Sequence, residues 1–145
     1  MKLSISILVV AFWYGFTPAH AEEEGTSYVV IANKDVPGSS ITLTMLKRIY
    51  LKDMTNWEGG GNVVPVDLDD ENSLRSSFSR KVFGKGVDEM KSYWINQKLT
   101  NNISPPVSMK NSKAAKKFVS QNGGAIGYVR QSEADSSVKV LTIEP

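Results

Sequence analysis

The stretch Val63-Val-Pro-Val-Asp-Leu-Asp-Asp-Glu-Asn-Ser-Leu-Arg-Ser-Ser-Phe78 decides how this chain folds. Its first four residues, 63–66, are apolar and mostly β-branched, which predicts a short buried strand. Leu74, Phe78 and the later Val82 recur every four residues, which predicts a helix with one apolar stripe. A strand that leads through an acidic loop into a helix is the building unit of an α/β domain.

The ends of this helix are marked by residues that stop or start helices. Asn72 and Ser73 are both suitable N-caps, and Gly84 is a suitable C-terminal cap. Just ahead of the helix lie four carboxylates, which we interpret as a solvated loop rather than an acid–base pair: Asp67, Asp69, Asp70 and Glu71.

The rest of the chain alternates between strand and helix patterns. Strands are predicted at 28–32, 125–129 and 138–143, with the last one pairing beside the first. Further helices are predicted around 46–50, capped by Thr42 or Thr44, from 87 or 88 to about 99, and from Asn111 or Ser112 to the glycines at 123–124. The predicted fold is a three-layer α/β domain, with a mixed central sheet of about four or five strands and helices on both faces.

The beginning of the chain has the features of an export signal. A short positive start is followed by an apolar run over residues 3–16, then Pro18 and the small-x-small sequence Ala19-His20-Ala21. The run is shorter than the roughly 20 residues that span a membrane. We therefore expect residues 1–21 to be a cleavable signal peptide, residues 22–145 to form the domain, and no membrane insertion after cleavage.

Composition excludes several classes of function. The chain has 17 Lys and Arg against 15 Asp and Glu, so it lacks the basic excess of a nucleic-acid-binding protein. It has no Cys, and its single histidine, His20, belongs to the expected signal peptide. Without His or Cys, the usual general base, thiolate nucleophile and zinc or copper ligands are missing. We expect no catalytic residues, metal site or cofactor.

Three segments occur in an order that is informative about family. They are Ile-Tyr-Leu-Lys-Asp-Met-Thr-Asn-Trp at 49–57, Asn-Ser-Leu-Arg-Ser-Ser-Phe at 72–78 and Gly-Gly-Ala-Ile-Gly-Tyr-Val at 123–129. Together they resemble the PstS-like substrate-binding proteins of phosphate ABC transporters, within the type II periplasmic binding proteins. The resemblance runs from Tyr28 to Leu141 and implies a single-lobe form of this fold, located in the periplasm, that binds phosphate for uptake or sensing.

The resemblance also implies a ligand site at the start of the helix: Asn72, Ser73, Leu74 and Arg75. A helix N-terminus can hold an oxyanion through its backbone N–H groups and partial positive charge. Asn72 stands where the family has Ser, Ser73 where it has Gly, and Leu74 where it has Thr; Arg75 matches an Arg that often follows. Leu74 supplies no hydroxyl, which departs from the pattern.

Two functions remain open from the sequence. The first is a periplasmic oxyanion-binding protein, with phosphate as ligand and a homodimer or an envelope protein closing the cleft. The second is a lobe that has lost its ligand and serves as a periplasmic protein-interaction module. The acidic run at 69–71 separates them, because carboxylates that face the helix start would repel a dianion.

Overall fold

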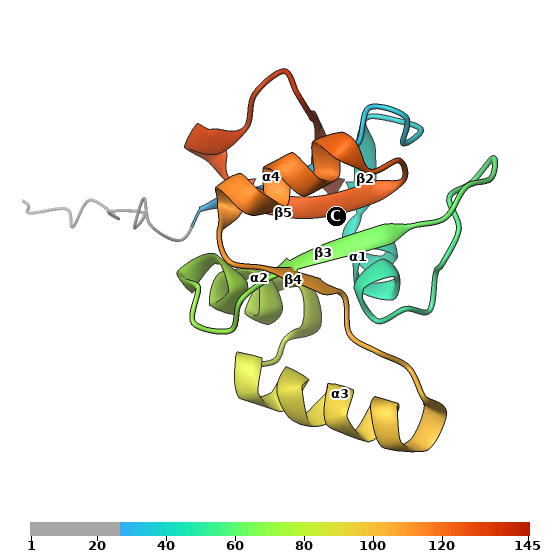
Figure 1. Cartoon of the computed structure of the whole chain (residues 1–145), viewed down its shortest axis with the longest axis vertical. Coiled ribbons are helices and arrows are strands. Elements are labelled where there is room, and N and C mark those ends of the chain that lie inside the picture. The colour runs from blue at the N-terminus through green and yellow to red at the C-terminus, as the bar shows by residue number, and fades with distance from the viewer. Residues whose placement is uncertain (1–26) are drawn as a thin grey trace, which may run out of the picture.

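The computed structural model describes residues 27–145, so the expected signal peptide at 1–21 lies outside the described part. Its centre is one six-stranded sheet, in the order β2-β6-β1-β5-β3-β4 (Figure 1). The strands are β1 (Tyr28–Ala32), β2 (Ser40–Thr42), β3 (Val64–Leu68), β4 (Val107–Met109), β5 (Ala125–Arg130) and β6 (Lys139–Glu144).

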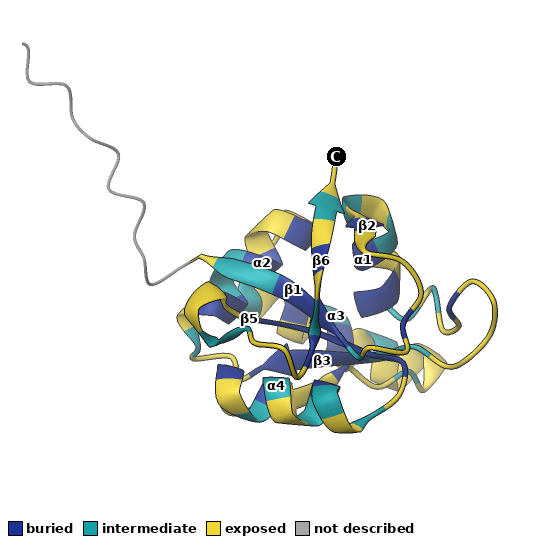
Figure 2. Ribbon diagram, turned by 90° about the horizontal axis from the view of Figure 1, so that it is seen from above, coloured by how far each residue is buried: buried dark blue, intermediate teal, exposed yellow. Residues whose placement is uncertain are grey.

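The sheet is mixed, as predicted. β1 is antiparallel to both β5 and β6, so the last strand does pair beside the first. β3 is parallel to β5 on one side and to β4 on the other, and β2 is parallel to β6. Figure 2 shows the buried residues gathered along β1, β3 and β5, in the middle of the sheet.

Helices cover both faces of the sheet, as the alternation in β5 shows. The Gly127 position faces α4 (Ser112–Gln121), because a Cβ there would lie 3.2 Å from Cγ2 of Val119. The next residue, Tyr128, faces the other side and stacks on Phe78 of α2 (Ser73–Phe83), with ring centroids 3.9 Å apart. The α1 helix (Leu43–Tyr50) lies on the same side as α2, since its Tyr50 ring also packs against Phe78. Consecutive residues of a strand point to opposite faces, so the domain has three layers.

The remaining helix, α3 (Val87–Asn101), contacts α2 and stands away from the sheet (Figure 1). Its Met90 and Trp94 are buried, whereas Ile95 and Leu99 are exposed. A short 3₁₀ helix, η1 (Gln131–Glu133), follows β5. Within residues 27–145, no helix combines the length and the apolar character needed to cross a membrane.

The helix ends follow the caps that the sequence contains. Thr42, rather than Thr44, caps α1, with its Oγ1 accepting from the Met45 N–H at 3.1 Å. The Asn72 side chain caps α2, and Gly84 ends it with φ at 67°, in the left-handed region that favours glycine. The Asn111 side chain caps α4.

The strand count is higher than the predicted four or five because of two strands with three residues each. Both β2 and β4 lie at the edges of the sheet. Edge strands this short carry little apolar alternation, so the sequence pattern does not reveal them.

Loss of the Phe78 ring should strongly destabilise the protein. The ring is fully buried among Tyr50, Tyr128 and Tyr28. Phe78→Ala is expected to lower the free energy of unfolding by about 3–5 kcal/mol, measured by urea unfolding followed through tryptophan fluorescence. The control Leu99→Ala, at a side chain 81% exposed, should change it by about 0.5 kcal/mol or less. Equal effects of the two substitutions would contradict this packing.

Candidate functional site

A cleft of about 590 Å³ opens where β3 ends and α2 begins. The end of β3, the following loop and the first turn of α2 form one wall, and α3 with the segment before β4 forms the other. Its lining combines six charged residues with apolar ones: Asp67, Leu68, Asp69, Asp70, Glu71, Arg75, Lys91, Trp94, Ile95, Pro105, Pro106 and Ser108. The cleft lies at the carboxyl end of a sheet strand, the usual ligand position in open α/β folds. Of the four residues predicted to bind a ligand, Arg75 lines this cleft, whereas Asn72 and Ser73 line a neighbouring hollow.

The four residues predicted at the helix start occupy different environments. Asn72 is half-buried and holds the Leu74 N–H through its Oδ1 at 3.0 Å. Ser73 is exposed, whereas Leu74 and Arg75 are buried. The Leu74 side chain belongs to the hydrophobic core, so its contribution at this turn is packing.

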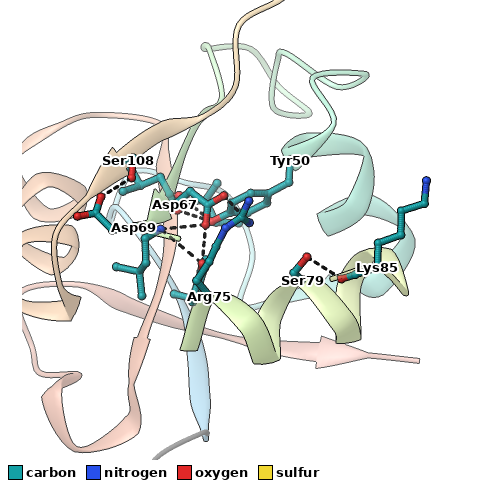
Figure 3. Close-up of polar contacts among 11 residues, drawn as sticks. Tyr50, Asp67, Asp69, Arg75, Ser79, Lys85 and Ser108 are labelled. Carbon is teal, nitrogen blue, oxygen red and sulfur yellow. Dashed lines mark hydrogen bonds and ion pairs between the residues drawn. The ribbon is translucent and has the colours of Figure 1, made fainter. Parts of the chain in front are cut away.

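Arg75 makes a buried ion pair with Asp67 across the turn (Figure 3). Its Nη1 lies 2.6 Å from Oδ2 of Asp67, and the two side chains are only 5% and 8% exposed. The Nη1 contact is not aligned as a hydrogen bond, and the buried Nε has no hydrogen-bond partner among residues 27–145. The guanidinium is thus close to a counter-charge while its hydrogen-bonding capacity is only partly used.

The second oxygen of Asp67 is held by two further donors. The Tyr128 hydroxyl donates to Oδ1 at 2.5 Å, and the backbone N–H of Leu68 donates to the same atom at 2.9 Å. Tyr50, on the neighbouring helix, donates its hydroxyl to the Val66 carbonyl at 2.7 Å. β3, β5, α1 and α2 therefore all contribute to one buried polar cluster in an otherwise apolar core.

Burial dominates the electrostatics of this cluster. Desolvation raises the pKa of Asp67 above its ordinary 3.8, although Arg75, the Tyr128 hydroxyl and the Leu68 N–H all act in the opposite direction. Burial, together with the Asp67 carboxylate, also raises the pKa values of Tyr128 and Tyr50 well above 10. Both tyrosines remain protonated donors at any physiological pH.

Two carboxylates of the acidic loop, Asp69 and Asp70, have partners other than the start of α2. Asp69 accepts from the Ser108 hydroxyl at 2.7 Å, and Asp70 pairs with Lys91 at 3.2 Å. Asn72, not an acid, caps the helix. The interpretation of this run as solvated is wrong for Asp67, which is buried in β3. Within residues 27–145, no three His, Cys, Asp or Glu side chains are placed to hold a metal ion.

The pairing of Asp67 with Arg75, and the role of Tyr128, were missed from the sequence. One signal for Asp67 was present: it interrupts the apolar run Val-Pro-Val-Asp-Leu, which the structure shows to be a single strand through Leu68. A charge inside a buried strand needs a partner. Nothing local pointed to Tyr128, which is 61 residues away.

Comparison with known proteins supports the fold. No family model matches the chain. A phosphate ABC transporter substrate-binding protein from Clostridium perfringens, solved with bound phosphate, superposes with a TM-score of 0.64 at 26% identity over 80% of this chain. An ABC-type phosphate transport receptor from Vibrio cholerae gives 0.64 at 18% over 80%, and PstS from Borrelia burgdorferi gives 0.61 at 15% over 81%.

These similarities define the class of fold: a three-layer lobe of the periplasmic binding protein type, with the PstS-like arrangement. The match spans 44%, 45% and 47% of the three proteins, so this chain corresponds to less than half of each.

The raised pKa of Asp67 predicts an unusual pH dependence of stability. A carboxyl whose pKa is raised by folding contributes stability below its unfolded pKa, and this contribution is lost as pH rises through the folded pKa. The destabilisation caused by Asp67→Asn should therefore be larger near about pH 4 than near about pH 7, measured by urea unfolding at each pH.

Asp135 provides a control with the opposite sign. Hydrogen bonds from Lys116 and Ser137 lower the pKa of this exposed carboxyl, so its contribution is lost as pH falls. The effect of Asp135→Asn should shrink, not grow, on acidification. The same trend in both variants would contradict the assignment for Asp67.

Proposed function

We propose that this protein binds a phosphate-like oxyanion in the cleft at the start of α2. The observation that carries the proposal is the Arg75 guanidinium, which lines the cleft, is buried, and has an Nε without a hydrogen-bond partner among residues 27–145. A buried donor without a partner is costly, and an anion entering the cleft would satisfy it with a charge-assisted hydrogen bond. Two of the three structural neighbours are phosphate transport proteins, and one of these contains phosphate, which supports the same class of ligand.

The start of α2 adds a favourable field. A helix N-terminus contributes about 0.3–1 kcal/mol to a nearby anion when exposed, and about 2 kcal/mol when partly buried. A hydrogen bond to a charged group adds about 1.5–3 kcal/mol. The sum of these two contributions is close to the roughly 4 kcal/mol that millimolar binding requires. It is well below the roughly 8 kcal/mol that micromolar binding requires.

The acidic residues of the cleft weaken the binding of an anion further. Asp67, Asp69, Asp70 and Glu71 all line it, against Arg75 and Lys91. The pairing of Asp69 with Ser108 and of Asp70 with Lys91 moderates the repulsion without removing it. Binding at neutral pH should therefore be in the millimolar range.

Tighter binding would need a second wall over the cleft. Structural neighbours are more than twice as long as the part this chain matches, and excluding water strengthens every polar contact in a site. A second copy of the chain, in a homodimer, or an envelope protein would supply this wall in the proposal.

The proposed biological setting is the periplasm, reached by cleavage of residues 1–21. There the protein would act without catalysis, as a binding protein linked to phosphate uptake or sensing through an ABC transporter. The absence of Cys and of any His other than His20 supports the non-catalytic proposal, because the thiolate nucleophile and the imidazole base are missing.

Calorimetric titration with phosphate tests the proposal. The wild-type protein should give saturable heat at millimolar phosphate near neutral pH. The double variant Asp67→Asn with Arg75→Gln should give none, because it removes the cleft cation while replacing the buried ion pair with two neutral amides that avoid an unpaired charge.

Lys81→Gln is the matched control. It removes one positive charge from α2 at an exposed position that lines neither this cleft nor the hollow beside Asn72 and Ser73, so phosphate binding should persist. Absence of binding heat from the wild-type protein would contradict the oxyanion proposal and favour the alternative, a protein-interaction module. Equal loss in both variants would show a general charge effect rather than a site.

A further inference from the structure

The Asp67 carboxylate is surrounded as a bound oxyanion would be. It receives a guanidinium contact from Arg75, a hydroxyl hydrogen bond from Tyr128 and a backbone N–H hydrogen bond from Leu68. Figure 3 shows these contacts converging on Asp67 at the start of α2. Planar guanidinium forks, hydroxyls and backbone N–H groups are also the donors that proteins offer to phosphate. Asp67 and Arg75 both line the cleft, so the group receiving these donors stands beside any ligand.

We propose that Asp67 sets the affinity of this cleft for anions, acting as an internal competitor that occupies the donors an incoming oxyanion needs. The inference rests on the proposed oxyanion function and names what controls it. While Asp67 is ionised, an anion must either displace it from Arg75 or share the guanidinium with a second negative charge a few ångströms away. Both routes weaken binding, because two anions at one buried site repel each other strongly.

Protonation of Asp67 should end its competition with an anion for Arg75. The neutral acid no longer attracts Arg75, and its own O–H becomes a donor that an anion can use. The charged or titratable groups that face this carboxyl or share its cleft come from every surrounding element: Arg75 from α2, Tyr128 from β5, Tyr50 from α1, Asp69, Asp70 and Glu71 from the loop, and Lys91 from α3.

Among these groups, Asp67 is the one whose titration can move toward mildly acidic pH. Arginine stays charged, and the tyrosines stay protonated because their pKa values are raised. Desolvation raises the pKa of Asp67 itself.

The first arm of the test measures sulfate affinity by calorimetry near neutral pH. Sulfate keeps its double charge throughout the experiment, so the ligand does not titrate. Asp67→Asn should bind about tenfold more tightly than the wild type, or better, because one charge-assisted interaction becomes available. The matched control Asp70→Asn removes a cleft charge at an exposed ion pair with Lys91 and should improve affinity by only about threefold or less.

The second arm repeats the sulfate titration from neutral pH to about pH 5. Wild-type affinity should rise on acidification, whereas the affinity of Asp67→Asn should stay nearly constant. If Asp67→Asn fails to fold, the wild-type profile is compared with that of Asp70→Asn, which keeps Asp67 and lacks an exposed cleft carboxylate; the rise on acidification should persist in it. A rise on acidification that Asp67→Asn shares in full, or a wild-type affinity that falls, would overturn the inference.

The outcomes separate this inference from the function on which it rests. Wild-type binding that Asp67→Asn leaves unchanged or weakens would overturn the role of Asp67 and keep the oxyanion site. No binding of sulfate or phosphate by either protein, at either pH, would overturn the oxyanion function and the inference with it. An equal gain in sulfate affinity from Asp67→Asn and Asp70→Asn would mean that only the net charge of the cleft matters. This result would also count against the role of Asp67.

Discussion

The buried contact between Asp67 and Arg75 is the constraint around which this end of the domain is organised. It joins the carboxyl end of β3 to the first turn of α2 and so determines how the helix leaves the sheet. Burying two charges costs several kcal/mol per ion, and removing one partner alone costs about 3–5 kcal/mol. Strand and helix are therefore held in one relative position at the point where the cleft opens.

That ion pair depends on the aromatic layer beneath it. Tyr128 points to the α2 side of β5, where it packs on Phe78 and donates to Asp67, whereas Gly127 before it lies against Val119 of α4 on the opposite face. Tyr50 completes the layer and satisfies the Val66 carbonyl. A polar cluster of this kind is stable only if its members are satisfied. Within residues 27–145, Nε and Nη1 of Arg75 lack hydrogen-bond partners, and for this reason our proposal makes Arg75 a donor to the ligand.

The cleft combines features that favour binding of an anion with charges that oppose it. A helix start and a buried arginine favour an oxyanion, while four carboxylates in the same lining oppose it. On the α3 side, Ile95 lines the cleft and is 62% exposed, and Leu99, one turn further along the helix, is 81% exposed. A chain that matches less than half of its structural neighbours would, in our proposal, use this cleft for weak or conditional binding.

The sequence by itself determined the local structure: the apolar stripe of α2, the caps at Asn72 and Gly84, and the alternation that yields a three-layer fold. These follow from contiguous residues, because helix periodicity and caps act over one or two turns. The ligand site at Asn72, Ser73, Leu74 and Arg75 stays a prediction, and the structure divides these four residues between surface and core. Only the tertiary structure decided that Asp67 is buried and bonded to Tyr128, 61 residues away. Burial is a property of the assembled layers, and neither segment alone contains it.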